Sequence, residues 1–323
     1  SAYAAAVEQD SPIAWWRMSR TEDGPLRNSA SSLPETEAAA LAAHVVGKVK
    51  LGEPGPAGEE FPDFDSENRA ICLPPGRNYL RVSDPGAASE LDFDNGDAIT
   101  IEAWVRPDAN PGPSFSYILG KGRTQNRGFS DRNQNYSLRL ANSKSSARLS
   151  FFFVDAETPT KGSGHDADGH RWTSTGELPL DGRWHHVAVT YVFGQPDSMR
   201  GYINGEETPG KWDLAGTTEK RPVTDDDELW IGSSMSGGAT LPGALDEVAL
   251  YRHALGPDRI SEHVHIFRRD EILAAVEAVS DSAPGDHVQF DVFEGVGAAR
   301  DWSFHPGQRQ PAYQSDVFAL TEL

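Results

Sequence analysis

Paired carboxylates are the first chemistry to consider, because hydrolysis of a glycosidic bond needs one carboxyl group to protonate the leaving oxygen and a second to act opposite it. A strand would present such a pair on one face in the spacings E-x-D-x-x-E or E-x-D-x-E, and neither occurs in these 323 residues. The nearest acidic run is Asp225 to Glu228 (DDDE), whose side chains repel one another and alternate between faces. It predicts a solvated turn or a cation-binding loop, and hydrolase activity is the least favoured function.

Histidines and carboxylates gather in the glycine-rich segment His165 to His170 (HDADGH). Both residue types bind zinc and other transition metals, although short Asp, His and Gly segments also form simple turns. No Ser, His and Asp arrangement indicates a nucleophile. Cys72 is the only cysteine, which excludes an intrachain disulfide and a thiolate metal cluster.

Two tryptophans stand apart from the other six. Trp172 (HRWTST) and Trp212 (GKWDLAG) fall among polar residues and are expected in loops, where so large an apolar ring is unusual. Two roles fit: a surface on which sugar rings stack, or a cover folded back over a sheet edge. Under the first role, the expected partners for sugar hydroxyls are Arg171, Asp213, Asp166 and Asn126.

Strands must position these residues. From Gly96 to Pro107 (GDAITIEAWVRP), apolar residues recur at every second position, as a half-buried strand requires. The segment Asp181 to Tyr191 (DGRWHHVAVTY) repeats this alternation. Between it and a third strand-like segment, Leu241 to Tyr251, Asn204-Gly205 predicts a tight primed turn, because both residues tolerate positive φ.

These segments, in this order, resemble the laminin G-like, concanavalin A-like jelly-roll domain of bacterial extracellular proteins. The matching motifs are the ITIEAWV strand, the WHHVA strand, the YINGE hairpin and a closing GALDEVALYRHAL segment, with Pro12 to Met18 (PIAWWRM) as a first strand. The resemblance covers about residues 3 to 267. It implies an all-β fold, a two-sheet antiparallel jelly-roll β-sandwich with short terminal helices and a C-terminal extension. It also implies packing and cross-strand hydrogen bonds for His185 and His186.

A structural calcium ion is a further implication of the resemblance. The closing strand of this superfamily often gives one carboxylate to a calcium near the N-terminal segment, and calcium prefers carboxylate and carbonyl oxygens. On that basis the expected metal ligands are Asp246, Asp23 and Asn28.

Other segments have local sequence patterns that predict helices and loops. Ser1 to Asp10 predicts a short helix, and Gly256-Pro257-Asp258 predicts the start of another. Ser114 to Tyr136 is rich in glycine and polar residues and is expected to be a long loop, without the spacing of a phosphate-binding loop. Thr158 to Glu177 is expected to be too polar for the core.

The C-terminal part changes pattern. We expect the jelly-roll domain with its C-terminal helix, which Asp270 to Val279 continues, to span residues 1–279. Residues 280–323 form an extension or the start of a truncated following domain, with a strand at His287 to Glu294. This tail resembles the stretch that links the jelly-roll domain to later domains in planctomycete multidomain surface proteins.

The net charge of −20 argues against nucleic acid as a partner, because phosphate contacts need a basic face. No apolar run is long enough to span a membrane, and no export signal opens the chain. The expected function is a non-catalytic module of a larger secreted bacterial protein that binds a polysaccharide, a glycan or another surface partner, located extracellularly, in the periplasm or at the cell surface. The alternative is a structural or interaction domain that contacts other domains of the parent protein and has no small ligand.

Overall fold

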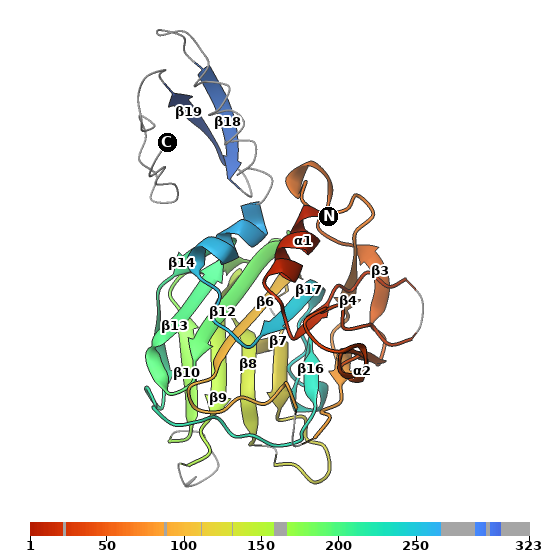
Figure 1. Cartoon of the computed structure of the whole chain (residues 1–323), viewed down its shortest axis with the longest axis vertical. Coiled ribbons are helices and arrows are strands. Elements are labelled where there is room, and N and C mark those ends of the chain that lie inside the picture. Colours follow the sequence, from red (N-terminus) through yellow and green to blue (C-terminus); the bar gives the residue numbers. More distant parts are fainter. Residues whose placement is uncertain are drawn as a thin grey trace.

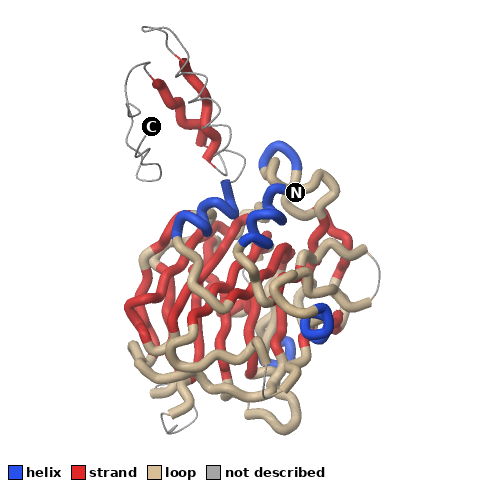
Figure 2. The backbone as a smooth tube through the Cα atoms, in the orientation of Figure 1, coloured by secondary structure: helices blue, strands red, loops and turns tan. Residues whose placement is uncertain are grey.

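The computed structural model describes residues 1–21, 24–86, 89–110, 112–130, 132–157, 167–265, 288–294 and 298–304. Two large antiparallel sheets pack face to face, which confirms the predicted two-sheet sandwich (Figure 1). Loops connect the strands at their ends, and the short helices lie on the outside of the two layers (Figure 2).

The first sheet has eight strands and contains the three segments with the clearest alternation. Its order is β14 (Glu206–Thr208), β13 (Gln195–Ile203), β12 (His185–Val192), β6 (Ala98–Pro107), β17 (Gly243–Tyr251), β4 (Arg69–Leu73) and β3 (Lys50–Pro54), and β1 (Ala14–Trp16) also pairs with β17. The predicted hairpin turn is confirmed between β13 and β14, where Asn204 and Gly205 have φ of 52° and 82°.

The second sheet has nine strands. Its order is β15 (Gly210–Leu214), β10 (Gly169–Ser174), β9 (Ser146–Val154), β8 (Gln134–Asn142), β7 (Phe115–Gly122), β16 (Leu229–Ile231), β5 (Tyr79–Val82) and β2 (His44–Val46), and β11 (Leu178–Pro179) pairs with β9.

The main core lies between the sheets. On β6, Ile99, Ile101 and Val105 face the second sheet and are fully buried, as the alternation predicts. The opposite face of β6 carries Trp104, which belongs to a second apolar cluster outside the first sheet.

Two helices cover this second cluster. Helix α1 (Ala2–Gln9) begins at the predicted position, where the Ser1 hydroxyl accepts a hydrogen bond from the backbone N–H of Ala4. The other helix starts at residue 257 and is described to residue 265, with Ile260 buried against the sheet. Arg259 on this helix donates to Asp10 at the end of α1, so the two helices lie side by side on the outer face of the first sheet (Figure 1).

The remaining described elements are short. They are α2 (Glu35–Ala40), the 3₁₀ turns η1 (Gly58–Glu60) and η2 (Met235–Gly237), and a separate hairpin of β18 (Val288–Glu294) and β19 (Ala298–Phe304). The hairpin confirms the strand expected at His287 to Glu294 and adds β19, which the sequence did not predict. Residues 270–279, where a helix was expected, and the expected boundary at 279 and 280 lie outside the described residues. None of the helices that the structure describes has the length and apolar character needed to cross a bilayer.

Two segments expected to lie outside the core are strands. The predicted loop at Ser114 to Tyr136 is wrong for both of its ends, because β7 and the start of β8 run through it. The predicted polar excursion at Thr158 to Glu177 contains β10, which pairs with β9 and β15 in the second sheet. Several polar side chains in these strands are buried, among them Lys121, Gln134 and His170, so the polar composition of both segments hides strands that lie inside the protein.

Candidate binding site

The outer face of the nine-stranded sheet carries large aromatic and basic side chains. On β8 and β9, Leu138, Leu140, Phe151 and Phe153 belong to the core between the sheets. Because successive side chains of a strand point to opposite faces, Arg139 and Phe152 lie on the outer face. Arg171 on β10 follows the same rule, since Trp172 beside it belongs to the core.

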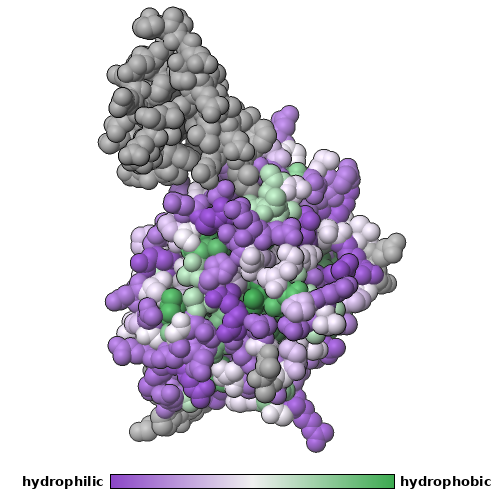
Figure 3. Space-filling view, viewed as in Figure 1, coloured by the Kyte–Doolittle hydropathy of each residue, from purple (hydrophilic) through white to green (hydrophobic). Residues whose placement is uncertain are grey.

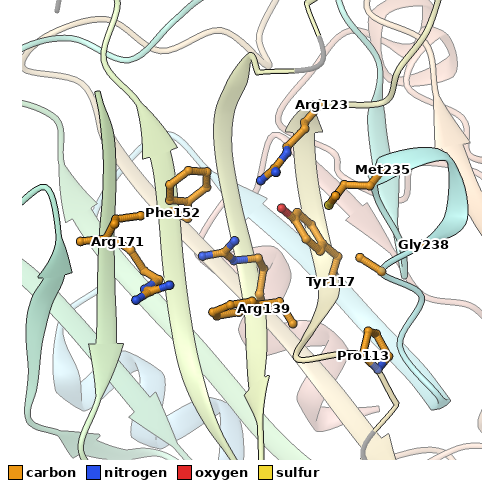
Figure 4. A pocket seen from close by; sticks show the side chains of 11 residues that line it. Pro113, Tyr117, Arg123, Arg139, Phe152, Arg171, Met235 and Gly238 are labelled. Carbon is orange, nitrogen blue, oxygen red and sulfur yellow. The ribbon is translucent and has the colours of Figure 1, made fainter. Parts of the chain in front are cut away.

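A cavity of about 380 Å³ opens over these residues. Figure 4 shows the guanidinium groups of Arg123 and Arg139 between the rings of Tyr117 and Phe152, and that of Arg171 below the Phe152 ring on the other side of Arg139. The described residues that line it come from five neighbouring strands, β15, β10, β9, β8 and β7, and from the segments that connect strands, and are Pro113, Phe115, Tyr117, Arg123, Arg139, Phe152, Arg171, Leu214, Met235, Gly238 and Ala239. This size falls within the range of small-molecule binding sites.

Arg139 forms the floor of the cavity. Its guanidinium carbon lies 4.5 Å from the centre of the Phe115 ring and 4.6 Å from that of Phe152, which are cation–π distances. Its Nη2 donates to the hydroxyl of Ser150 at 2.9 Å. Burial lowers the pKa of Arg139, against an opposing effect of Tyr117. The residue is 4% exposed and still carries its charge.

The rim of the cavity has an unusual backbone. Arg123 and Met235 both have positive φ, 58° and 53°, which is uncommon for residues other than glycine. The Arg123 N–H donates to Asn133 Oδ1 at 2.9 Å, and its carbonyl accepts from the Met235 N–H at 3.2 Å. These hydrogen bonds hold two lining residues in strained conformations, a feature that clusters at binding sites.

Met235 is also the one large hydrophobic side chain that is exposed among the described residues, at 38%. On the face seen in Figure 3, hydrophilic residues cover most of the described surface and hydrophobic ones form only small separate patches. An exposed methionine at the edge of a cavity offers an adaptable apolar contact for a ligand.

Two of the predicted ligand-binding residues lie at this site. Arg171 lines the cavity, with its guanidinium carbon 5.3 Å from the centre of the Phe115 ring. Its Nε donates to Asp213 Oδ1 at 2.6 Å, so the expected pair is brought together, although Asp213 itself is bound to the arginine.

The predicted tryptophan surface is wrong. Trp172 is 4% exposed and lies on β10 with its ring in the core between the sheets, close to Gly201 and Gly210. Trp212 is half-buried on β15 and packs against the same core, edge to face with Tyr191 and Phe153. Both indoles point inward because the polar residues around them form the outer face of a strand.

The two remaining predicted ligand-binding residues, Asn126 and Asp166, are not among the described lining of the cavity. Asn126 is half-buried in the loop after β7, where its N–H donates to the Thr124 hydroxyl, and it does not line the cavity. Asp166 lies outside the described residues, as does His165 of the HDADGH segment. The described members of that segment are held elsewhere: Asp168 pairs with Arg132 at 3.6 Å, and His170 lies 2.9 Å from Asp155.

The two predicted calcium ligands that the structure describes, Asp246 and Asn28, have hydrogen-bond partners within the protein. Asp246 is fully buried on β17, where Asn68 Nδ2 donates to Oδ2 at 2.7 Å and the Glu247 N–H donates to Oδ1. Asn28 Oδ1 accepts from the N–H groups of Trp15 and Ala30, which occupies that oxygen. Asp23 lies outside the described residues. In the part of the chain that is described, no three His, Cys, Asp or Glu side chains gather as metal ligands.

Asp246 and Glu247 nonetheless place two carboxyl groups together inside the protein. Burial, followed by the charge of Glu247, raises the pKa of Asp246 well above its ordinary value. Burial also raises the pKa of Glu247 to about 7, although Arg17 and the Trp15 N–H oppose the shift. Arg17 Nε lies 3.3 Å from Glu247 Oε1, so one cation accompanies the pair.

A second buried ionic cluster surrounds Glu102 on the outer face of β6. His186 Nε2 lies 3.1 Å from Glu102 Oε2, which confirms the expected cross-strand contact, and Tyr251 donates to Oε1. His263 Nδ1, from the helix at 257–265, lies 3.0 Å from Oε2. Burial alone would raise the pKa of Glu102, but His263 and His186 hold it well below its ordinary value. This cluster fastens the helix to the sheet.

The acidic run after residue 224 has structural partners. Thr124 Oγ1 donates to buried Asp227 Oδ1 at 2.5 Å, and Trp230 Nε1 donates to Glu228 Oε2 at 2.8 Å. Neither residue lines the cavity.

Six residues on which the site depends were not predicted from the sequence: Phe115, Tyr117, Arg123, Arg139, Phe152 and Met235. Arg139 and Phe152 stand within an alternating pair of segments, Leu138 to Leu140 and Leu149 to Phe153, so the alternation placed them on an outer face without marking it as functional. Phe115 and Tyr117 lie in the segment expected to be a loop.

Comparison with known proteins agrees with this fold. The laminin G-type family model described as the concanavalin A-like lectin/glucanases superfamily matches residues 76–261, more than half of the chain. A search of the curated proteins finds no significant match.

Several solved structures are similar at low identity. Domain 4 of AbnA, a GH43 extracellular arabinanase from Geobacillus stearothermophilus, in complex with arabinotriose, has a TM-score of 0.42 and 14% identity, over 79% of this chain and 98% of that one. Trypanosoma rangeli sialidase in complex with sialic acid has a TM-score of 0.46 and 16% identity, over 79% of this chain and 33% of that one. The binding domain of Paraclostridial Mosquitocidal Protein 1 has a TM-score of 0.47 and 14% identity, over 80% and 53%.

The family match includes the strands that position the cavity, β7 to β10, together with the closing strand β17. On that match and the two-sheet architecture, the chain belongs to the concanavalin A-like lectin/glucanases superfamily.

Proposed function

We propose that this chain is a non-catalytic binding module for carbohydrate, and that the ligand occupies the cavity on the outer face of the nine-stranded sheet. The observation that carries the proposal is the lining of that cavity. Phe115, Tyr117 and Phe152 supply aromatic faces, and Met235 supplies an exposed apolar rim. Aromatic and apolar surfaces with a few polar groups are typical of small-molecule sites, and aromatic rings suit the apolar face of a sugar.

The same lining favours binding over hydrolysis. Glycoside hydrolysis requires two carboxyl groups about 5 to 10 Å apart across the bond. Every charged residue in the described lining is an arginine. We further propose that the module acts outside the cytoplasm as part of a larger bacterial protein, since soluble polysaccharides and surface glycans are found there.

A glycan array probed with the whole chain tests the proposal. Binding of at least one glycan class in the millimolar to micromolar range, about 4 to 8 kcal/mol, is the expected result. The same glycans incubated with the protein should release no reducing ends. Release that disappears on changing Asp226 or Glu228 would instead identify a hydrolase, and an array with no signal would favour a structural or interaction domain.

A further inference from the structure

The cavity has the opposite charge to the chain as a whole. The chain carries 49 acidic and 29 basic residues. The cavity is lined by Arg123, Arg139 and Arg171, and no Asp or Glu is among its described lining residues. Asp213 neutralises Arg171 from beside the cavity. The charges of the other two arginines, Arg123 and Arg139, are not neutralised in this way.

Arg139 has no carboxylate partner among the described residues. Its Nη2 is bound to Ser150, while its buried Nε has no hydrogen-bond partner in the described part of the chain. An unpaired buried charge destabilises the folded state, and the cation–π contacts with Phe115 and Phe152 offset only part of this cost. The neighbouring charges of Arg123 and Arg171 make the cost larger.

Arg123 shows the same lack of a partner at the rim. Its backbone is fixed by Asn133 and Met235, yet the guanidinium of this half-buried residue forms no ion pair with any described residue. Figure 4 shows this group directed toward Tyr117, on the same side of the cavity opening as Met235. Both unpaired cations therefore face one space.

We propose that the cavity binds an anionic sugar, whose carboxylate or sulfate group pairs with Arg139 and Arg123. The proposal rests on the carbohydrate-binding function above and names the class of ligand. Oxyanions form charge-assisted hydrogen bonds with guanidinium groups, and the guanidinium of Arg139, whose Nε has no hydrogen-bond partner among the described residues, lines the cavity. A neutral sugar would cover Arg139 and leave its charge unpaired, so the arginines select against it.

Isothermal titration with matched charged and uncharged ligands tests the inference. One arm compares trigalacturonic acid with its methyl ester, and the other compares carrageenan oligosaccharides with the same oligosaccharides after removal of their sulfate groups. We expect the charged member of at least one pair to bind about tenfold more tightly or better, which corresponds to one charge-assisted hydrogen bond. The arm that shows the preference identifies carboxylate or sulfate as the recognised group.

Two variants test whether the preference for the charged ligand depends on an arginine of the cavity. Arg123→Gln should weaken binding of the preferred ligand about tenfold and leave the melting temperature unchanged. Arg148→Gln removes the same charge from the outer face of β9, where Arg148 is bound to Glu177 away from the cavity, and should have no effect. Equal binding of charged and neutral ligands would overturn the inference and leave the proposed function standing. Failure to bind any glycan would overturn both.

Discussion

The guanidinium carbon of Arg139 on β8 lies 4.6 Å from the centre of the Phe152 ring on β9. This contact places a buried cation on the floor of a cavity, in a geometry that rings stabilise only in part. The protein therefore retains a charge that its own fold does not neutralise, a feature expected where binding, not stability, determines the residue.

Replacing Arg139 with methionine removes the charge and keeps most of the side-chain volume. We expect the free energy of unfolding of Arg139→Met, measured by urea denaturation, to stay within about 1 kcal/mol of the wild-type value or to rise, because an uncompensated buried charge is removed and only the Ser150 hydroxyl loses a hydrogen-bond donor. Binding of anionic oligosaccharide should be lost. A decrease of several kcal/mol with unchanged binding would show that Arg139 is structural.

The ionic cluster around Glu102 predicts a pH dependence of stability. Burial alone would lower the pKa of His263, but the charge of Glu102 and the contact with Asp10 raise it from 6.5 to about 9. The folded state then binds the proton more tightly than the unfolded state. The stabilisation is fully present below pH 6.5 and is lost as the pH rises to about 9, by about 3 kcal/mol at most.

Urea denaturation between pH 7 and 9 measures this loss, and the titration of Glu247, whose pKa is about 7, contributes only in the lower part of that range. His263→Gln should reduce the slope of stability against pH. His44→Gln changes an exposed histidine and should retain the wild-type slope. A wild-type protein with equal stability at pH 7 and pH 9 would contradict the protonated state of His263.

Trp172 provides a test of the core. Its ring packs between the sheets beside Gly210, where an added Cβ would collide with it. Trp172→Ala should lower the free energy of unfolding by about 3 to 5 kcal/mol, because it removes a large buried ring. Trp212→Ala should cost less, since that ring is half-buried. A melting temperature unchanged by Trp172→Ala would place the indole outside the core.

Calcium binding remains a prediction from the resemblance. The buried carboxyl groups of Asp246 and Glu247, accompanied by Arg17, are a location where a cation would relieve repulsion. If calcium binds the folded chain, EDTA should lower the melting temperature and added calcium should restore it. Asp246→Asn should abolish the response, and Asp213→Asn should retain it. Identical melting curves with and without EDTA would show that calcium does not stabilise the folded chain.

The sequence predicted the sandwich well wherever one strand face is uniformly apolar. Ile99, Ile101 and Val105 mark such a face on β6, and Asn204-Gly205 marks a turn through its backbone conformation. These signals are local, because they depend on period and on φ.

The binding site could not be predicted from patterns along a single strand. Trp172 looked exposed because its neighbours His170 and Arg171 are polar, but His170 is held by Asp155 and Arg171 faces the cavity. Arg139 looked like an ordinary outer-face residue, because only the pairing of β7, β8 and β9 places Phe115 and Phe152 on either side of it. Cross-strand neighbours cannot be read from spacing along one strand.

The most direct test of the binding site compares two aromatic residues on opposite faces of the same sheet. Phe115 is half-buried in the cavity lining, and Trp212 is half-buried against the core. Isothermal titration of the glycan that binds the wild-type chain should show that Phe115→Ala weakens binding about tenfold or more, while Trp212→Ala keeps the wild-type affinity. Loss of binding in Trp212→Ala with wild-type affinity in Phe115→Ala would contradict the assignment of the site to the outer face of the nine-stranded sheet.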